Sequence, residues 1–378
     1  MHYETERPEE KKLRQELESK TDAYSLRVKR YLAMPDLSRT PGSPINEIVE
    51  RIKSQPDFKD FDTIKVPEIV PVDVSFDLYG FAPDHPARRP SDTYFLDETN
   101  LLRPHTTVMW YYYLNQPEVK EKIKNGETLG FFSFGKVYRK DEIDRNHMNV
   151  FHQMDGGFLI PKSKKVIKVE DLQEVLSNIA KAVFGPDIKY RFNPDTFPYT
   201  DPSLEMEVEI DGRWIEVLGC GIMTDNLIRN LGLNPDEWSN WAFGFGLERL
   251  AIISMNLPDI RLLWSEDERV KKQLKLGTKF VEVSKYPPVV RDISFIVPNT
   301  FIPNDYFDFV RESAPGIIEQ VELLDKYENK EKFGEGKISY AYRITYRSLD
   351  KTLTSTEVDG LHKNIEEVTR KVFEANIR

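Results

Sequence analysis

Polar and aromatic side chains alternate in the segment FHQMDGG, residues 151–157. On a β-strand, successive side chains point to opposite faces, so Phe151, Gln153 and Asp155 share one face. That face offers an aromatic plate on which a planar ring can stack, with an amide and a carboxylate that can hold an ammonium group. Taken alone, the segment favours a plainer interpretation, a half-exposed strand whose polar residues face water.

An arginine precedes this strand, in VYRKDEIDRNHM at 137–148. Arg139 projects from a predicted strand, and a guanidinium beside a strand–loop–strand can clamp a phosphate with two parallel hydrogen bonds. The acidic residues just after it offer another partner, a surface salt bridge. The segment alone favours the salt bridge.

A glycine-hinged turn follows an apolar strand in WAFGFGLERLAIISM, residues 241–255. Gly244 and Gly246 let the backbone approach a ligand closely, and Arg249 falls in the first turns of the helix that follows. The pattern is neither the dinucleotide-binding fingerprint, whose third glycine is missing, nor a phosphate-binding loop with Gly-Lys-Ser/Thr. It suits a polyphosphate tail, or else tight strand–helix packing with Arg249 paired to an acid.

Two further segments carry weaker signals. HTT places His105 and Thr107 two residues apart, and FPYT places Phe197 and Tyr199 on either side of a proline. The carboxylates that come after FPYT could hold Mg²⁺ or line a solvated strand face; they are Glu205, Glu207, Glu209 and, further on, Glu216.

The elements that must position these groups are mostly short strands. Period-two patterns predict strands over 67–78, 93–96, 129–138, 150–160, 204–210, 213–219 and 240–244. Helical spacing predicts helices over 1–32, 45–54, 106–115, 170–184 and 246–256. Many strands with few helices between them indicate a large, mainly antiparallel α+β unit.

A smaller unit follows the Pro-Pro pair near residue 288. The patterns predict, in order, a strand over 290–297, a helix over 304–314, a strand over 317–327, a loop over 328–336, a strand over 337–348 and a last helix. That helix opens with a capping box, Thr354 and Glu357. The order β-α-β-β-α is typical of the ferredoxin-like fold, also called the split β-α-β motif. One face of its third strand is apolar, since it carries Ile338, Tyr340, Tyr342, Ile344 and Tyr346.

This unit has no strongly basic tail. Residues 284–378 carry 14 Lys and Arg against 16 Asp and Glu. Arg343 and Arg347 share one sheet face and could form a local basic patch for a nucleic acid. A solvated outer face explains them equally well.

The length and composition of the chain exclude several classes of protein. The 378 residues suffice for two domains, and no apolar run approaches the roughly 20 residues of a membrane span. The N-terminus lacks the apolar stretch of a signal peptide and is too acidic for a transit peptide. The single cysteine, Cys220, excludes an intramolecular disulfide and a redox cluster. A net charge of −10 argues weakly against constitutive coating of a nucleic acid.

In their order along the chain, these segments resemble the class II aminoacyl-tRNA synthetases, specifically the phenylalanyl-tRNA synthetase family. DHPARRPSDTYFL (84–96) is similar to motif 1, VYRKDEIDRNHMNVFHQMDGG (137–157) to motif 2 and AFGFGLERLAI (242–252) to motif 3. LLRPHTT, FPYTDPSLEMEVEI and WIEVLGCGIM resemble three further family segments. PDIRLLWSEDERVKKQL followed by SKYPPVVRDISF resembles the single-chain mitochondrial type, in which a ferredoxin-fold anticodon-binding domain is fused to the catalytic domain.

The resemblance implies an α+β fold in four regions. They are an N-terminal helical extension (1–40), a class II catalytic domain built on an antiparallel sheet (41–276), a linker (277–288) and a ferredoxin-fold anticodon-binding domain (289–378). In that last domain, Arg343 and Arg347 become candidates for tRNA binding.

For ATP, the resemblance implies that Arg139 and Arg249 hold the phosphates. His147 would contact the phosphates too, and Phe151 would stack on adenine. Glu216 is the candidate ligand of Mg²⁺. The glycines that shape the floor of the site would be Gly219, Gly221, Gly244 and Gly246.

For the amino acid, the resemblance assigns the amino and carboxyl ends to His105, Thr107, Gln153 and Asp155, and the side-chain pocket to Phe197, Tyr199 and Ala242. Asp155 stands where the family has glutamate, so its carboxylate is one methylene shorter. Tyr199 brings a hydroxyl where the bacterial pattern has phenylalanine. The glycine pair 156–157 is expected to keep the strand end open to the ligand.

The implied activity is ATP-dependent activation of phenylalanine and its transfer to tRNA(Phe), by a monomer with no membrane association. The cytoplasm is the expected compartment, with the mitochondrial matrix as the alternative. Two other functions stay open: a related enzyme that activates another amino acid or charges another acceptor, and a non-catalytic RNA-binding protein that keeps the fold.

Overall fold

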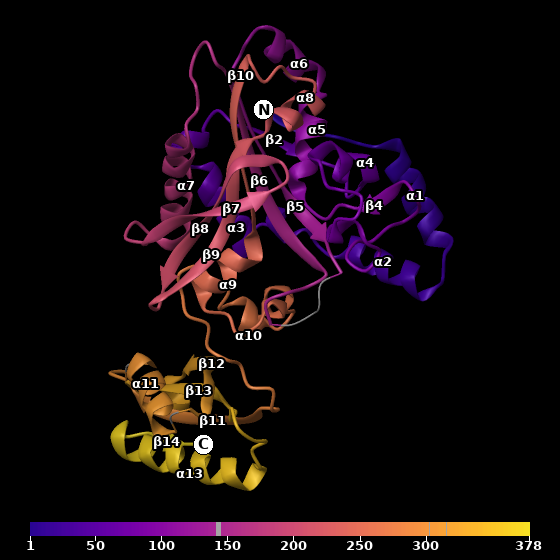
Figure 1. Ribbon diagram of the computed structural model, residues 1–378. Helices are drawn as coiled ribbons and strands as arrows, with labels where there is room; N and C mark the ends of the chain where they lie inside the picture. Colours follow the sequence, from indigo (N-terminus) through magenta and orange to yellow (C-terminus); the bar gives the residue numbers. More distant parts are fainter. Residues whose placement is uncertain (141–144, 302, 315) are drawn as a thin grey trace. The chain divides into compact units, whose positions relative to one another are not determined.

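The chain folds into two units. The computed structural model describes residues 1–140, 145–301, 303–314 and 316–378. The described residues form one unit over Met1–Phe280 and a second over Val281–Arg378 (Figure 1). The boundary falls inside the predicted linker 277–288, and residues 1–40 belong to the first unit.

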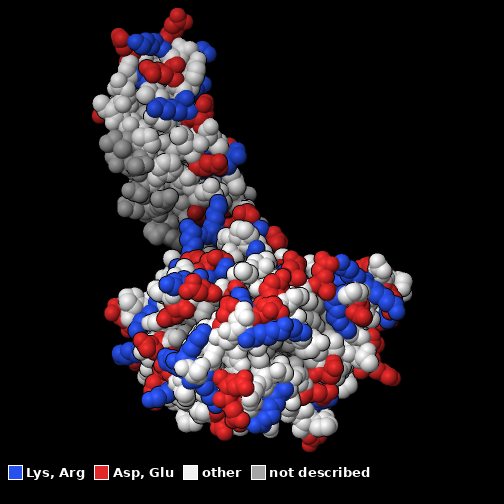
Figure 2. Space-filling model, turned by 90° about the horizontal axis from the view of Figure 1, so that it is seen from above, with Lys and Arg blue, Asp and Glu red and all other residues white. Residues whose placement is uncertain are grey.

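Charges of both signs are mixed on the surface. On the face that Figure 2 shows, Lys and Arg side chains lie interspersed among Asp and Glu side chains. Attraction of a polyanion to this face must therefore come from particular cations rather than from the face as a whole. No helix in the described part of the chain is long and apolar enough to cross a membrane.

An eight-stranded sheet organises the first unit. Its strands lie in the order β1-β2-β5-β6-β10-β9-β8-β7. Their bounds are β1 His2–Glu4, β2 Asp62–Lys65, β5 Leu129–Tyr138, β6 Val150–Pro161, β7 Tyr190–Phe197, β8 Thr200–Ile210, β9 Arg213–Met223 and β10 Trp238–Gly246. β1, β2 and β5 pair in parallel, and the other neighbours are antiparallel. FHQMDGG lies in β6, near the middle of the sheet.

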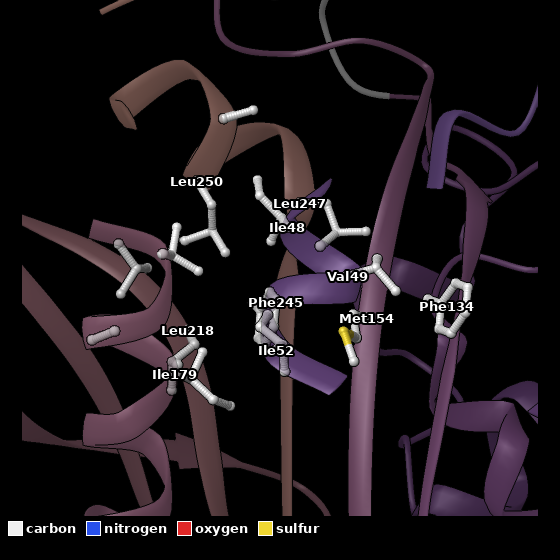
Figure 3. Packing of buried hydrophobic residues seen from close by; sticks show 14 of the residues in the cluster. Ile48, Val49, Ile52, Phe134, Met154, Ile179, Leu218, Phe245, Leu247 and Leu250 are labelled. Atoms are coloured by element: carbon white, nitrogen blue, oxygen red, sulfur yellow. The ribbon is translucent and has the colours of Figure 1, made fainter. Parts of the chain in front are cut away.

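Three helices cover one face of this sheet: α3 Pro44–Lys53, α7 Val169–Phe184 and α9 Leu247–Met255. In α3, apolar residues recur at helical spacing and turn one stripe toward the sheet; they are Ile45, Ile48, Val49 and Ile52. Figure 3 shows residues of this stripe beside Met154 of β6 and Phe245 of β10. Each fully buried aliphatic side chain stabilises such a core by about 1.5–3 kcal/mol, so this face of the sheet is structural.

The opposite face carries shorter elements and the cavity described below. The helices are α4 Val72–Ser75, α5 Met109–Leu114, α6 Pro117–Lys124 and α8 Asp225–Asn230, with 3-10 turns η3 Asp77–Tyr79 and η5 Thr106–Val108. A two-stranded sheet joins β3 Ile69–Pro71 to β4 Asn100–Leu102. Trp110 and Tyr113 of α5 pack here with Phe131 of β5 and Leu159 of β6.

The N-terminal helices, α1 Pro8–Ser19 and α2 Ala23–Ala33, have a hydrophobic cluster of their own. Leu17, Val28 and Tyr31 pack there with Tyr138 and Val150. Since those last two residues end β5 and begin β6, the helices lie against one end of the central hairpin. The remaining elements of this unit are η1 Leu37–Arg39, η2 Pro56–Phe58, η4 Pro86–Arg88, η6 Ile260–Trp264 and α10 Glu268–Lys271.

The second unit is a four-stranded sheet in the order β12-β13-β11-β14 with helices on one face. Its elements are β11 Val289–Pro298, α11 Pro303–Ser313, β12 Ile318–Glu328, α12 Lys330–Phe333, β13 Lys337–Tyr346, α13 Ser355–Val372 and β14 Asn376–Ile377. The predicted apolar face of β13 is buried against these helices. The predicted capping box is confirmed, because Thr354 and Glu357 each bind the backbone N–H of the other.

Several predicted elements are wrong in detail. The expected helix over 1–32 is two helices, because Asp22 accepts a 2.9 Å hydrogen bond from the N–H of Ser25 and starts α2 afresh. The strand expected over 67–78 is only β3, followed by α4. Pro67 and Pro71 bound β3, and proline has no N–H for a ladder.

Three more predictions need smaller corrections. The strand expected over 93–96 is a single bridge between Phe95 and Leu101. The helix expected over 106–115 begins as the 3-10 turn η5 before α5. The loop expected over 328–336 contains the one-turn helix α12.

Candidate active site

A cavity of about 740 Å³ lies against the sheet where β6, β9 and β10 run side by side. Its lining brings together most of the predicted site residues, which come from distant parts of the sequence: His105, Thr107, Arg139, His147, Phe151, Gln153, Asp155, Phe197, Tyr199, Glu216, Gly219, Ala242, Gly244, Gly246 and Arg249. Phe151, Gln153 and Asp155 of β6 face the cavity, while His152 and Met154 are fully buried behind them. The predicted alternation along this strand is therefore correct. The predicted acidic partners of Arg139 at 141–144 lie outside the described residues.

Gly221 is not part of this lining. A Cβ at that position would stand 2.5 Å from the carbonyl oxygen of Pro202 and 2.6 Å from Cβ of Thr200. The glycine therefore permits close strand packing. Gly156 and Gly157 likewise make room for rings and do not open the strand to a ligand, because a Cβ at either would lie 2.4 Å from Phe243 or Trp110, respectively.

The Asp155 carboxylate is a buried, hydrogen-bonded group of the cavity lining. Its side chain is 5% exposed, and the hydroxyls of Thr106 and Thr107 donate to its two oxygens at 2.8 and 2.6 Å. Burial raises the pKa of this carboxyl to about 6, although the two hydroxyls and Arg139 oppose the shift. Gly244 lies opposite on β10, where a Cβ would come within 2.7 Å of Asp155 Oδ1.

Two buried acceptors lie in the same lining. His105 donates from Nε2 to the carbonyl oxygen of Ser75 at 3.0 Å. Burial, and then Arg139, lower the pKa of His105 to about 4, so the ring is neutral and Nδ1 carries a lone pair. Within the described part of the chain, neither His105 Nδ1 nor Gln153 Oε1 has a hydrogen-bond partner. With Asp155, they are three hydrogen-bond acceptors carried by residues of the lining, the number that a group with three N–H donors needs.

Aromatic rings form one wall of the cavity. Phe197 and Tyr199 are nearly parallel, with ring centres 6.0 Å apart and an angle of 11° between planes. Tyr79 meets Tyr199 edge-on at 6.2 Å, and Phe81 stacks on His105 at 6.2 Å. Ala242 adds a small apolar surface. The wall suits a planar apolar group.

Sequence reasoning missed part of this wall. Phe76, Tyr79 and Phe81 lie in a segment that was predicted in part as a strand. Tyr79 also donates to the carbonyl oxygen of Thr107 at 2.6 Å. The signal in the sequence is a cluster of aromatics in SFDLYGF, but nothing local ties it to the HTT segment.

Arg139 follows the last residue of β5 and lines the cavity. Its Nε donates to the carbonyl oxygen of Pro104 at 2.9 Å. The guanidinium lies 5.3 Å from the centre of the Phe151 ring, a cation–π distance. The two predicted ATP-binding side chains, Arg139 and Phe151, are thus adjacent.

Arg249 lies in the first turn of α9, with about half of its side chain exposed. Its Nη1 donates to the carbonyl oxygen of Glu216 at 3.3 Å and lies 3.5 Å from the Glu216 carboxylate. In the described residues, no three His, Cys, Asp or Glu side chains gather to hold a metal ion. A single carboxylate still fits Mg²⁺ if phosphate oxygens supply other ligands, which is how this ion is commonly held.

A buried pair behind the cavity was also missed. His152 donates from Nδ1 to Glu248 at 2.6 Å, and its backbone N–H donates to the same carboxylate. Nε2 accepts from the N–H of Leu37 at 2.9 Å. β10 ends at Gly246, opposite Gln153, so Glu248 continues the hydrogen bonding of β6 beyond the ladder.

The two arginines of the second unit that were predicted to bind tRNA both have acidic partners. Arg343 binds Asp292 through two 2.8 Å hydrogen bonds. Arg347 lies just beyond the end of β13 and donates to Glu319 at 2.9 Å and to the carbonyl oxygen of Tyr286. Contact of either arginine with a phosphate would have to replace or share an ion pair.

Comparison with known proteins gives two family matches and a set of relatives. The family described as "tRNA synthetases class II core domain (F)" matches residues 32–274. The family described as "Ferredoxin-fold anticodon binding domain" matches residues 284–378.

These relatives are all named as phenylalanine–tRNA ligases. A mitochondrial phenylalanine–tRNA ligase of Mus musculus is 36% identical over 340 residues, which cover 80% of this chain and 72% of that protein. A chloroplastic/mitochondrial one of Arabidopsis thaliana is 36% identical over 321 residues, covering 82% and 71%. A mitochondrial one of Saccharomyces cerevisiae is 30% identical over 421 residues, covering 89% and 87%.

Proposed function

The chain belongs to the phenylalanine–tRNA ligase family of class II tRNA synthetases, and on this basis we propose that its cavity activates phenylalanine with ATP for transfer to tRNA(Phe). One observation carries the proposal. Three acceptors for an ammonium group, an aromatic wall and two arginines line the same cavity. An aromatic amino acid and a nucleoside triphosphate need those three features together.

The amino acid binds through both of its ends. The ammonium group donates three hydrogen bonds, which Asp155, Gln153 and His105 accept. The hydroxyl of Thr107 fixes the orientation of Asp155. The phenyl ring lies against Phe197, Tyr199 and Ala242. This pose leaves the substrate carboxylate on the side of Arg139.

Positioning and positive charge, rather than a protein nucleophile, drive activation. Adenine stacks on Phe151, and His147 contacts the phosphates. An oxygen of the substrate carboxylate attacks the α-phosphorus, and pyrophosphate leaves. Arg139 stabilises the negative charge that develops on the α-phosphate, and Arg249 holds the departing pyrophosphate. In the second step, a hydroxyl of the terminal adenosine of tRNA(Phe) attacks the activated carbonyl, and AMP leaves.

Mg²⁺ fits the cavity through Glu216, an exposed carboxylate of the lining. When bound with ATP, the ion neutralises phosphate charge. Glu216 also accepts a contact from Arg249. The Glu216 carboxylate can thus orient both Arg249 and the metal ion.

The second unit supplies the tRNA contact. Its match to an anticodon-binding family supports this assignment, and Arg343 and Arg347 are the proposed phosphate contacts within it. A tRNA-binding unit in the same chain as the catalytic unit favours action as a monomer. The names of the relatives favour the mitochondrial matrix over the cytoplasm as its compartment.

Amino-acid-dependent ATP–pyrophosphate exchange tests this function. The full chain should exchange with phenylalanine far faster than with the nineteen other amino acids, and should then charge tRNA(Phe). Exchange with a different amino acid would identify a related enzyme of other specificity. Absence of both exchange and ATP binding would identify a non-catalytic RNA-binding protein.

Tyrosine should be activated measurably. It differs from phenylalanine by one hydroxyl, and an apolar pocket rejects an added hydroxyl by only about 10²-fold. The measurement compares kcat/KM for the two amino acids in the exchange assay. The Arg139→Ala variant, purified in parallel, controls for activity of host enzymes. A tyrosine/phenylalanine ratio far below about 10⁻⁴ would mean that the wall contains a polar group that rejects the hydroxyl.

A further inference from the structure

Tyr31, in the N-terminal helices, is linked to the catalytic arginine by hydrogen bonds through Asn149. Tyr31 lies in the last turn of α2, just before the first residue matched by the synthetase core family. Its ring is 7% exposed and meets Tyr94 edge-on at 5.4 Å. Its hydroxyl donates to Asn149 Oδ1 at 2.9 Å, in a buried hydrogen bond that spans 118 residues.

Asn149 in turn holds the backbone of Arg139 on both sides. The carbonyl oxygen of Asn149 accepts from the N–H of Arg139 at 3.0 Å. The side-chain Nδ2 of Asn149 donates to the carbonyl oxygen of Arg139 at 3.1 Å. The β5–β6 ladder ends at Tyr138 and Val150. The Asn149 amide therefore extends this pairing to Arg139.

The hydroxyl of Tyr31 anchors the Asn149 amide. Nδ2 donates to the carbonyl oxygen of Arg139, so Oδ1 is the atom that faces Tyr31 and accepts from its hydroxyl. A rotated amide would set Oδ1 against the carbonyl oxygen of Arg139. Tyr31 and Arg139 thus hold opposite ends of one amide, and removal of the hydroxyl takes away one of these two hydrogen bonds.

From this geometry we propose that Tyr31 is a positioning residue for ATP. It acts through Asn149 on the backbone of Arg139, whose guanidinium lies over Phe151. The N-terminal helices are thereby part of the nucleotide site, although α1 and all but the last two residues of α2 lie outside the matched core. The inference rests on the proposed function, because it assumes that Arg139 and Phe151 bind ATP.

The test compares two tyrosines of the same helix. Tyr31→Phe removes the hydroxyl and keeps the ring. Tyr24→Phe is the matched control, since the Tyr24 hydroxyl donates to the carbonyl oxygen of Phe95 at 2.8 Å and makes no bond with Asn149. In the exchange assay, Tyr31→Phe should raise KM for ATP by about 2- to 10-fold, the effect of one lost hydrogen bond. KM for phenylalanine should stay unchanged, and Tyr24→Phe should change neither constant.

A combined variant separates positioning from general stability. Thermal unfolding of both single variants reports stability. In an Asn149→Ala background, Tyr31→Phe should add no further increase in KM for ATP, because the connecting amide is already gone. The inference is overturned if Tyr31→Phe and Tyr24→Phe behave alike, or if Tyr31→Phe raises KM for ATP and KM for phenylalanine together. It is also overturned if Tyr31→Phe still raises KM for ATP in the Asn149→Ala background. Loss of exchange by the unmodified chain would overturn the proposed function instead.

Discussion

Replacing Arg139 by alanine should lower phenylalanine-dependent ATP–pyrophosphate exchange by about 10²- to 10³-fold, the usual loss when one preorganised charge-stabilising donor is removed. The guanidinium lies at the cavity wall over Phe151 and is held by the carbonyl oxygen of Pro104. In the proposed mechanism it stabilises charge that grows at the α-phosphate. The loss should therefore appear in kcat and kcat/KM together.

Two further variants sharpen this experiment. Arg51→Ala removes an exposed arginine of α3 that pairs with Glu47, and it should leave exchange unchanged. Arg139→Lys keeps the charge but loses the planar fork, so only part of the activity should return. Circular dichroism and thermal unfolding check that the fold survives. Near-normal exchange by Arg139→Ala would refute the assigned role of this residue.

Replacing Asp155 by asparagine should raise KM for phenylalanine by about 10- to 10²-fold, the worth of one hydrogen bond to a charged group. The amide can still accept from Thr106 or Thr107, so the shape of the site is kept and only the negative charge is lost. KM for ATP should not change. Asp57→Asn, at an exposed carboxylate bound by Asn178, is the matched control.

The same carboxyl sets an expected pH dependence. Burial raises the pKa of Asp155 to about 6, and the ionised form is the one that attracts an ammonium group. As pH falls through about 6, protonation removes that attraction, so kcat/KM for phenylalanine should fall; above neutrality it should be level. This profile reports groups of the free enzyme. In Asp155→Asn, the fall of kcat/KM near pH 6 should disappear. If the fall is equally large in this variant, it belongs to another titrating group.

Much of the sheet could be predicted from local sequence. β5 and β6 have the predicted bounds to within one residue, because long period-two patterns are a strong signal. The strand expected over 67–78 is only three residues long, since β-branched residues extend the strand pattern beyond β3 Ile69–Pro71 while proline has no N–H with which to continue the ladder. In the second unit, the capping box of α13 could be predicted because Thr354 and Glu357 lie within one helical turn of each other.

The candidate site was predictable only where a motif carried it. His105, Gln153 and Asp155 were found by resemblance, and the alternation along β6 gave the common face of Gln153 and Asp155. Thr106 was missed, although it binds Asp155 as Thr107 does. The residues that complete the site act across large sequence separations. His152 and Glu248, for example, are 96 positions apart, and no local pattern encodes such a contact.

The alternation along β6 gives this strand two kinds of mutational tolerance, interleaved at single-residue spacing. Substitution of His152 or Met154 disturbs a packed interior and is selected against through the amount of folded protein. We expect substitution of Phe151 or Gln153 to leave that interior intact and to act through the proposed catalysis, whereas substitution of Asp155, which is buried and accepts from Thr106 and Thr107, should affect both. A deep mutational scan of this strand, scored separately for abundance and for charging, would therefore give two profiles that peak at alternate positions.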